Sequence, residues 1–358
     1  MIYIVYENYW EIGKGVQKKI KAQCQVFQEA FKKVYYTVYS GQMLHLFQND
    51  KLIEKEFALT EKECNEIIVE WLIKYNIRRT YIRYWFADKW LIYLLQKQKE
   101  LGIKSVLEFP SIPYDGIFSK QIVSEDHYYR EQIHEFIHCC TTFGKYHEVF
   151  QIPCIAIPNG VDIKEQKKKH LRKPDGTIVL LAVARFWKAH GYERLIEGIH
   201  NYYNNGGDRN IIFNIVGDGV QLEFYRRLVD AYHLHKHVIF YGRLEGEALD
   251  LIYDNSDIAV SALGFYKVGI QSAAPIKSGE YCSRGIPFIY GYDELSVDEN
   301  IYFVCKVTND ATPININSVI DFYEKMYNGK DFIEDMRVYA KEHLLWKKIL
   351  RPVIEYLN

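Results

Sequence analysis

Hydrophobic and polar positions along the first half of the chain alternate between two periods. Short apolar runs typical of buried strands are separated by apolar residues at helical spacing. Thr60 and Glu63 add a capping-box pattern at the start of one helix. The predicted strands are residues 2–6, 34–39, 44–48, 80–85, 105–109, 138–142 and 155–158, and the predicted helices are 16–31, 60–75, 87–101 and 125–137. This alternation predicts a mainly parallel sheet with helices on both faces.

The second half repeats the pattern. Its predicted strands are residues 177–183, 211–216, 238–241 and 257–261, with another from Phe288, and residues 316–356 are predicted to be helical. The turn signal Asn159-Gly160 and a lysine-rich stretch at 164–174 separate the two halves. A chain of 358 residues is long enough for two α/β cores. We therefore expect domains at 1–168 and 169–335, followed by a terminal helix at 336–358.

Composition narrows the class of protein. Apolar content of 48%, charged content of 25% and a net charge of -1 are ordinary for a soluble globular protein and give no electrostatic case for nucleic acid as a partner. The seven cysteines show no C-x-x-C spacing, and neither a signal peptide nor a membrane span is evident, so we expect a cytoplasmic protein. Lysines on the first helix, such as Lys14, Lys18 and Lys19, would suit peripheral contact with the inner face of the plasma membrane, or simply a solvated face.

Two loops carry residues suited to phosphate. Arg185 and Lys188 follow the strand at 177–183, where an arginine fork and a lysine point charge would suit a diphosphate, although a pair of surface cations is the plainer alternative. Gly13 and Gly15 stand between a strand and a helix, which is the phosphate-binding arrangement of nucleotide folds or an ordinary tight turn. The full dinucleotide fingerprint is not present, so NAD binding is weakly supported.

Residues 263–290 combine a glycine-punctuated loop, a short helix with one carboxylate, Glu280, and a strand. An open α/β sheet presents a ligand site in this way, at the carboxyl ends of its strands. The run Glu280-Tyr281-Cys282-Ser283-Arg284-Gly285-Ile286-Pro287 resembles the donor-site signature of retaining GT-B glycosyltransferases, family 4 in particular. Pro275-Ile276-Lys277 ahead of the acid is similar to the branch found in bacterial surface-polysaccharide clusters. The resemblance implies two Rossmann-like, doubly wound domains that face each other across a cleft, with the terminal helix at 336–358 packing back on the first domain.

The same resemblance assigns candidate roles, residue by residue. It extends over 177–290 through ordered landmarks at Arg185-x-x-Lys188, Gly217-Asp218-Gly219 and Tyr241-Gly242-Arg243. It implies that Arg185 and Lys188 bind the diphosphate and act in catalysis, and that Glu280 binds the ribose. The implied donor-site set is Gly13, Gly15, Arg185, Lys188, Gly217, Asp218, Tyr241, Gly242, Arg243, Ser272 and Glu280. Ser272 departs from the family, which commonly has an acid at that position.

Glu108 is the candidate catalytic residue on the acceptor side. It is the residue before the last in the strand at 105–109, ahead of a proline-rich loop, and we expect it to project into the cleft with Tyr114 and Asp115. It would then serve as a base. The alternative is a structural carboxylate that holds the loop.

The implied activity is that of a retaining, metal-independent, hexosyltransferase-type enzyme. It would move a sugar from a nucleotide-diphosphate donor to a glycan or lipid-linked acceptor in surface-polysaccharide biosynthesis. No cofactor is expected, and the chain has no D-x-D triplet to hold a divalent metal. The alternatives are a non-catalytic GT-B partner of another transferase and a sugar-nucleotide epimerase. The base, sugar, acceptor, linkage and oligomeric state remain open.

Overall fold

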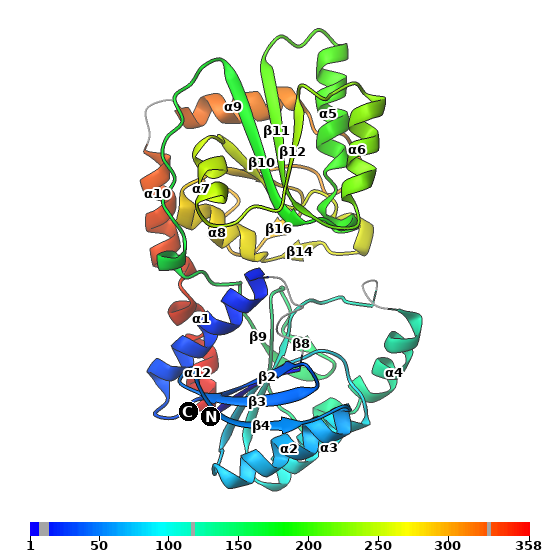
Figure 1. Cartoon of the computed structure of the whole chain (residues 1–358), viewed down its shortest axis with the longest axis vertical. Helices are drawn as coiled ribbons and strands as arrows, with labels where there is room; N and C mark the ends of the chain where they lie inside the picture. The colour runs from blue at the N-terminus through cyan, green and yellow to red at the C-terminus, as the bar shows by residue number, and fades with distance from the viewer. Residues whose placement is uncertain (7–13, 116–118, 328–330) are drawn as a thin grey trace. The chain divides into compact units, whose positions relative to one another are not determined.

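The computed structural model describes residues 1–6, 14–115, 119–327 and 331–358, which form two compact units (Figure 1). The first unit joins Met1–Gly160 to Trp346–Asn358, and the second is Val161–Leu345. The sequence predicts that the domains end at residues 168 and 335. In the structure the chain passes from the first unit to the second after Gly160 and returns to the first unit after Leu345. The last thirteen residues thus belong to the same unit as the start of the chain.

The first unit is built on a sheet that has nine strands in the described residues, in the order β4-β3-β2-β1-β5-β6-β7-β9-β8. The central strands β2-β1-β5-β6-β7-β9 are parallel to one another. At the edges, β3 and β4 on one side and β8 on the other pair antiparallel. The strands are β1 (Ile2–Val5), β2 (Tyr35–Ser40), β3 (Met43–Gln48), β4 (Lys51–Phe57), β5 (Arg79–Arg83), β6 (Lys104–Phe109), β7 (Cys140–Thr142), β8 (Glu148–Val149) and β9 (Ile152–Ala156). The sequence prediction missed β4, because this edge strand is mostly exposed and carries charged residues.

The first three helices of the first unit begin and end within two residues of their predicted bounds, whereas the fourth spans Lys120–Arg130 instead of the predicted 125–137. The capping box at Thr60 and Glu63 is confirmed. These helices are α1 (Lys14–Ala30), α2 (Glu61–Lys74), α3 (Lys89–Glu100), α4 (Lys120–Arg130), α11 (Trp346–Ile349) and α12 (Arg351–Leu357). Pro352 stands in the first turn of α12, where its missing N–H costs nothing.

The second unit has an all-parallel sheet that, in the described residues, contains six strands in the order β12-β11-β10-β13-β15-β17. They are β10 (Thr177–Arg185), β11 (Asn210–Asp218), β12 (Val238–Gly242), β13 (Ile258–Val260), β15 (Phe288–Tyr290) and β17 (Val304–Lys306). A small separate ladder joins β14 (Ser272–Ala273) to β16 (Asp293–Glu294). The helices are α5 (Glu193–Asn204), α6 (Leu222–Ala231), α7 (Gly246–Asp254), α8 (Ile276–Arg284), α9 (Ile316–Tyr327) and α10 (Phe332–Tyr339).

The strand order locates one ligand edge in each unit. From β10 the chain winds outward through β11 and β12, and then returns to the other side of β10 with β13. In the first unit the same reversal falls between β1 and β5. Open α/β sheets bind ligands outside the carboxyl ends of the strands at such a switch point.

Candidate functional site

The switch point of the second unit is closed by two loops that touch through their backbones. The Leu263 N–H donates to the His190 carbonyl (2.8 Å), and the Gly264 N–H donates to the Ala189 carbonyl (3.2 Å). Gly191 has φ +63°, and a Cβ there would lie 2.5 Å from the Gly264 nitrogen. Only glycine fits this contact, so the loops after β10 and β13 hold each other in place.

Two cations stand at the end of β10 and on the loop that follows it. Arg185 is the last residue of β10, opposite Asp218 at the end of β11, and Lys188 begins a short 3-10 turn. Both are exposed. Among residues the structure describes, neither side chain has an ion pair or a hydrogen bond. Two unpaired cations at the ligand edge of a parallel sheet are available to bind an anion such as a diphosphate.

Gly217 lets the ends of β10 and β11 approach each other closely. Its φ is +134°, and a Cβ there would lie 1.8 Å from the Ala184 carbonyl oxygen. The next residue completes the contact, because the Phe186 N–H donates to the Asp218 carbonyl (2.5 Å). The Gly217-Asp218-Gly219 run therefore fixes the backbone that carries Arg185. The local function of this run is to hold the end of β11 against the end of β10. The glycines in the sequence do not by themselves show which backbone they approach.

The predicted base-contact residues lie at the end of β12. Tyr241 is exposed, and Gly242 has φ +67°. The Arg243 Nε lies 3.2 Å from Glu245 Oε1, in an exposed ion pair. Arg243 is therefore paired with a carboxylate two residues further along the chain. Contact of Tyr241, Gly242 and Arg243 with the base of a nucleotide stays a prediction.

Ser272 and Glu280 lie on consecutive elements near the same edge. Ser272 is in β14 and pairs with Asp293 of β16, whereas Glu280 is in the middle of α8 and partly buried. Lys267, on the loop before β14, forms an ion pair with Glu193 at the start of α5. The ribose role of Glu280 stays a prediction.

Lys277 and His190 were not among the predicted site residues, and the structure brings them to this edge. The Lys277 Nζ donates to the Tyr192 hydroxyl (3.4 Å), and the Trp187 N–H donates to His190 Nδ1 (3.1 Å). One signal in the sequence could have drawn attention to Lys277. It is the second residue of α8, where a positive charge opposes the helix dipole.

Glu108 lies in the first unit at the centre of a buried polar network. Its Oε1 is 3.1 Å from Lys19 Nζ and 2.6 Å from Arg83 Nη1. Its Oε2 accepts hydrogen bonds from the Tyr81 hydroxyl (2.7 Å) and from Gln23 Nε2 (2.8 Å). The Glu108 side chain is 0% exposed, and both cations are buried with it.

This geometry corrects two expectations. The expected projection of Glu108 from the sheet is wrong, because two cations and two hydrogen-bond donors hold it inside the unit. Burial alone would raise the pKa of Glu108, but the charges of Lys19 and Arg83 outweigh it and lower the pKa to about 2. Such a carboxylate is a poor base, which favours a structural role, although its partners named above are side chains of α1 and β5 and not of the proline-rich loop of the stated alternative. Lys19 likewise does not belong to a solvated basic face.

The remaining candidates of the first unit are Gly13 and Gly15. Gly13 lies outside the described residues, so the predicted loop before the first helix is not described. Gly15 stands in the first turn of α1. A Cβ on Gly15 would meet nothing within 4 Å, so the described part of the chain gives no steric reason for glycine there.

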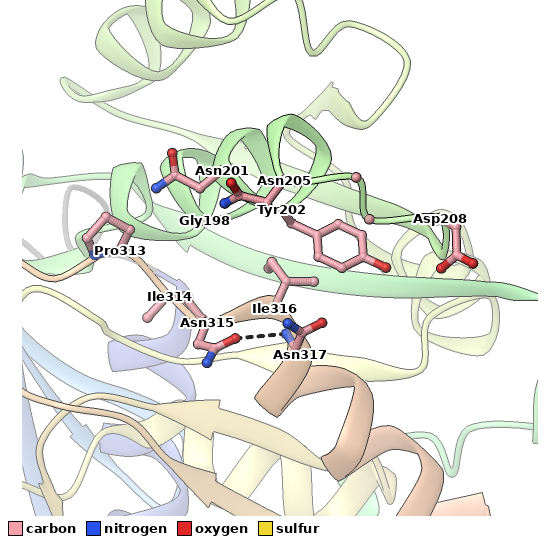
Figure 2. A pocket seen from close by; sticks show the side chains of 12 residues that line it. Gly198, Asn201, Tyr202, Asn205, Asp208, Pro313, Ile314, Asn315, Ile316 and Asn317 are labelled. Carbon is pink, nitrogen blue, oxygen red and sulfur yellow. Dashed lines mark hydrogen bonds between the residues drawn. The ribbon is translucent and has the colours of Figure 1, made fainter.

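Two hollows are lined by other residues. A cavity of about 570 Å³ is lined by asparagines at the end of α5 and the start of α9, and Figure 2 shows Asn201, Asn205 and Asn315 around it. It lies before the amino end of β11, the opposite end of the sheet from Arg185. In the first unit, a hollow of about 130 Å³ beside the carboxyl ends of β1 and β5 is lined by Tyr6, Tyr39, Tyr84, Trp85 and Phe86, among others.

The described residues contain no cluster of three His, Cys, Asp or Glu side chains that could hold a metal ion. None of the helices in the described ranges is long and apolar enough to cross a membrane.

Two doubly wound sheets, one all-parallel and one parallel except at its edges, define the class of protein, the GT-B fold. The model of the family described as glycosyl transferases group 1 matches residues 163–312, which lie within the second unit and are less than half of the chain. This match contains the switch point with Arg185, Lys188 and Glu280. No curated protein matches the sequence.

Solved structures are similar over the full length at low sequence identity. A glycosyltransferase from Rickettsia africae has a TM-score of 0.70 and 15% identity, covering 99% of this chain and 97% of that one. Anabaena HepE in complex with UDP has a TM-score of 0.67 and 11% identity over 99% and 98%. WaaG, a glycosyltransferase involved in lipopolysaccharide biosynthesis, has a TM-score of 0.63 and 12% identity over 100% of both chains. At such identities the likeness shows the fold.

Proposed function

We propose that the protein is a glycosyltransferase that binds a nucleotide-diphosphate sugar at the switch point of its second unit. The observation that carries this proposal is the pair of unpaired cations, Arg185 and Lys188, at the carboxyl edge of β10. The match of residues 163–312 to glycosyl transferases group 1 supports it independently. So does the UDP bound by HepE, which has a similar fold.

The site offers the charge that sugar transfer requires. Departure of a nucleoside diphosphate leaves negative charge on the phosphate, and preorganised cations stabilise that charge as it develops. The amino end of α8 adds a favourable dipole at the same edge. Glu280 would accept hydrogen bonds from the ribose hydroxyls, and Tyr241, Gly242 and Arg243 would neighbour the base.

The finer assignment rests on the resemblance of the motifs. We propose a retaining, metal-independent reaction within family 4, on a glycan or lipid-linked acceptor in surface-polysaccharide biosynthesis. The role of WaaG in lipopolysaccharide biosynthesis supports this direction. We assign the acceptor to the first unit, where the hollow beside β1 and β5 is lined by aromatic side chains of the kind on which sugar rings pack.

Thermal stabilisation by UDP, GDP, CDP and TDP in the presence of EDTA tests the donor site. A ligand that binds only the folded protein raises the melting temperature, and the nucleotide with the largest shift identifies the base. Arg185→Ala and Lys188→Ala should each weaken that binding by roughly tenfold to a hundredfold, because each removes a charged hydrogen bond to phosphate.

Arg227→Ala on α6 and Lys325→Ala on α9 are matched controls, since both replace exposed cations far along their helices from the switch point. They should bind like the parent. If none of the four nucleotides shifts the melting temperature, the proposal fails and the non-catalytic alternative gains weight. If Arg185→Ala and Lys188→Ala both bind like the parent, the donor site lies elsewhere.

A further inference from the structure

Lys277 is a partly buried cation without a counter-ion in the described part of the chain. Its ammonium donates one hydrogen bond, to the neutral Tyr192 hydroxyl, at 3.4 Å. Glu280, one turn further along α8, influences it through space but does not lie within ion-pairing distance. An ammonium removed from water is costly unless an anion or several acceptors receive it. The site therefore favours binding of an anion.

His190 provides a neutral donor beside this ammonium. Its Nδ1 accepts a hydrogen bond from the Trp187 N–H, so the ring proton must reside on Nε2. Burial and the nearby charge of Lys277 hold the pKa of His190 well below its ordinary value, so the ring stays neutral. His190 thus has a fixed tautomer, with an N–H at Nε2 that donates to no group in the described residues.

Both residues belong to the switch point that carries Arg185 and Lys188. His190 ends the 3-10 turn that Lys188 begins, and its carbonyl binds the loop after β13. Lys277 reaches the same place from α8, through its contact with Tyr192. The loops after β10 and β13 therefore meet with cations on both sides, Arg185 and Lys188 on one and Lys277 on the other.

We propose that Lys277 binds a phosphate oxygen of the donor's diphosphate, opposite Arg185 and Lys188, with the Nε2–H of His190 as a second, neutral donor. This inference rests on the proposed function, because it takes the nucleoside diphosphate as the ligand. It adds one charge and one N–H to the groups that stabilise the leaving phosphate.

The surroundings of Lys277 determine how many protons the protein takes up when a phosphate binds. Burial lowers the pKa of Lys277 to about 7, and the Glu280 carboxylate offsets only part of that shift. The groups that face it are Glu280 on its own helix, and His190 and Tyr192 from the neighbouring loop. A bound phosphate would raise the pKa again, so binding at pH 8 should take up close to one proton, and less at pH 7.

Isothermal titration calorimetry at pH 8, in two buffers of different ionisation enthalpy, measures this uptake. The ligand is the nucleoside diphosphate selected by the thermal-shift panel. Lys277→Met should bind roughly tenfold to a hundredfold more weakly and take up no proton. Lys277→Arg keeps its charge at pH 8, so it should bind within a few-fold of the parent, again without uptake. Lys325→Met, which replaces an exposed lysine on α9, should match the parent in both respects.

Each outcome decides a different point. If the parent binds no nucleotide, the proposed function fails. If the parent binds but takes up no proton, or if Lys277→Met retains full affinity, the function stands and the role of Lys277 is wrong. Should Lys277→Met fail to fold, the parent's proton uptake and the Lys277→Arg variant still decide the matter.

Discussion

At the scale of single residues, Glu108 shows that a carboxylate at a strand end can serve the fold rather than the reaction. Its two oxygens are occupied by Lys19, Arg83, Tyr81 and Gln23, all inside the first unit. The network joins α1 to β5 and β6, three elements far apart in the sequence. Removal of one charged partner from such a buried network is strongly destabilising, because the opposite charges lose part of the attraction that offsets their removal from water.

Glu108→Gln should therefore destabilise the first unit by roughly 3 kcal/mol, because Lys19 and Arg83 would lose the buried carboxylate that they share. The depressed pKa of Glu108 stabilises the fold above about pH 4.5, and this contribution is lost as the pH falls toward 2. Urea unfolding followed by tryptophan fluorescence between pH 7 and pH 3 measures both effects.

Glu70→Gln on α2 is the control for Glu108→Gln, since Glu70 is exposed. It should leave both the stability and its pH dependence unchanged. A Glu108→Gln variant as stable as the parent, but inactive on an acceptor, would restore Glu108 as a catalytic candidate.

At the scale of elements, the position of Arg185 depends on how β10 ends against β11. Gly217 brings the two strands together where a side chain would collide with the Ala184 carbonyl. The sequence indicated a turn at this point. It could not show that the glycine faces the backbone of the preceding strand, because that strand is more than thirty residues away.

Gly217→Ala should lower the stability of the second unit by several kcal/mol and weaken nucleotide binding with it. The methyl group would lie 1.8 Å from the Ala184 carbonyl oxygen, so the backbone before Arg185 must move. Thermal melting with and without the nucleotide measures both changes.

Gly206→Ala, before the other end of β11, is the comparison for Gly217→Ala. Gly206 also has a positive φ (+81°), but a Cβ there would meet nothing within 4 Å. It should cost about 1–2 kcal/mol and leave nucleotide affinity unchanged. Equal losses at the two glycines would show that the close approach of the strands does not matter.

At the scale of the whole molecule, the chain completes its first unit only with its last residues. Trp346 lies against Gly160, where a Cβ would be 2.5 Å from the indole ring. Leu350 and Val353 are fully buried, and Arg79 Nε donates to the Leu357 carbonyl (2.6 Å). The segment from Trp346 onward is therefore part of the hydrophobic core of the unit that begins at Met1.

Leu350→Ala should destabilise the first unit by about 2–5 kcal/mol and leave the second unit unaffected. Hydrogen exchange resolved by segment tests this, since amides of β1, β5 and β6 should exchange faster while those of β10 and β11 do not change. Glu355→Ala, an exposed position on α12, should exchange like the parent. Faster exchange in β10 and β11 of Leu350→Ala would contradict this division of the core.

The sequence by itself determined the elements, because each depends on local periodicity, capping and turn residues that lie close together in the chain. The apolar residues Leu195, Ile196 and Ile199 recur at helical spacing and are buried on α5, and Gly285 ends α8 in the left-handed conformation. It also located Arg185 and Lys188, since a cation pair directly after a buried strand is a local pattern.

Only the tertiary structure decided which side chains meet, because burial and electrostatics depend on elements distant in sequence. Glu108 changed from a projecting base to a buried counter-ion once α1 supplied Lys19 and Gln23. Lys277 became a candidate ligand for phosphate once Tyr192 and His190 lay beside it. The free-energy cost of removing a charge from water depends on the groups that surround it in the folded protein. The periodicity of the sequence does not show which groups these are.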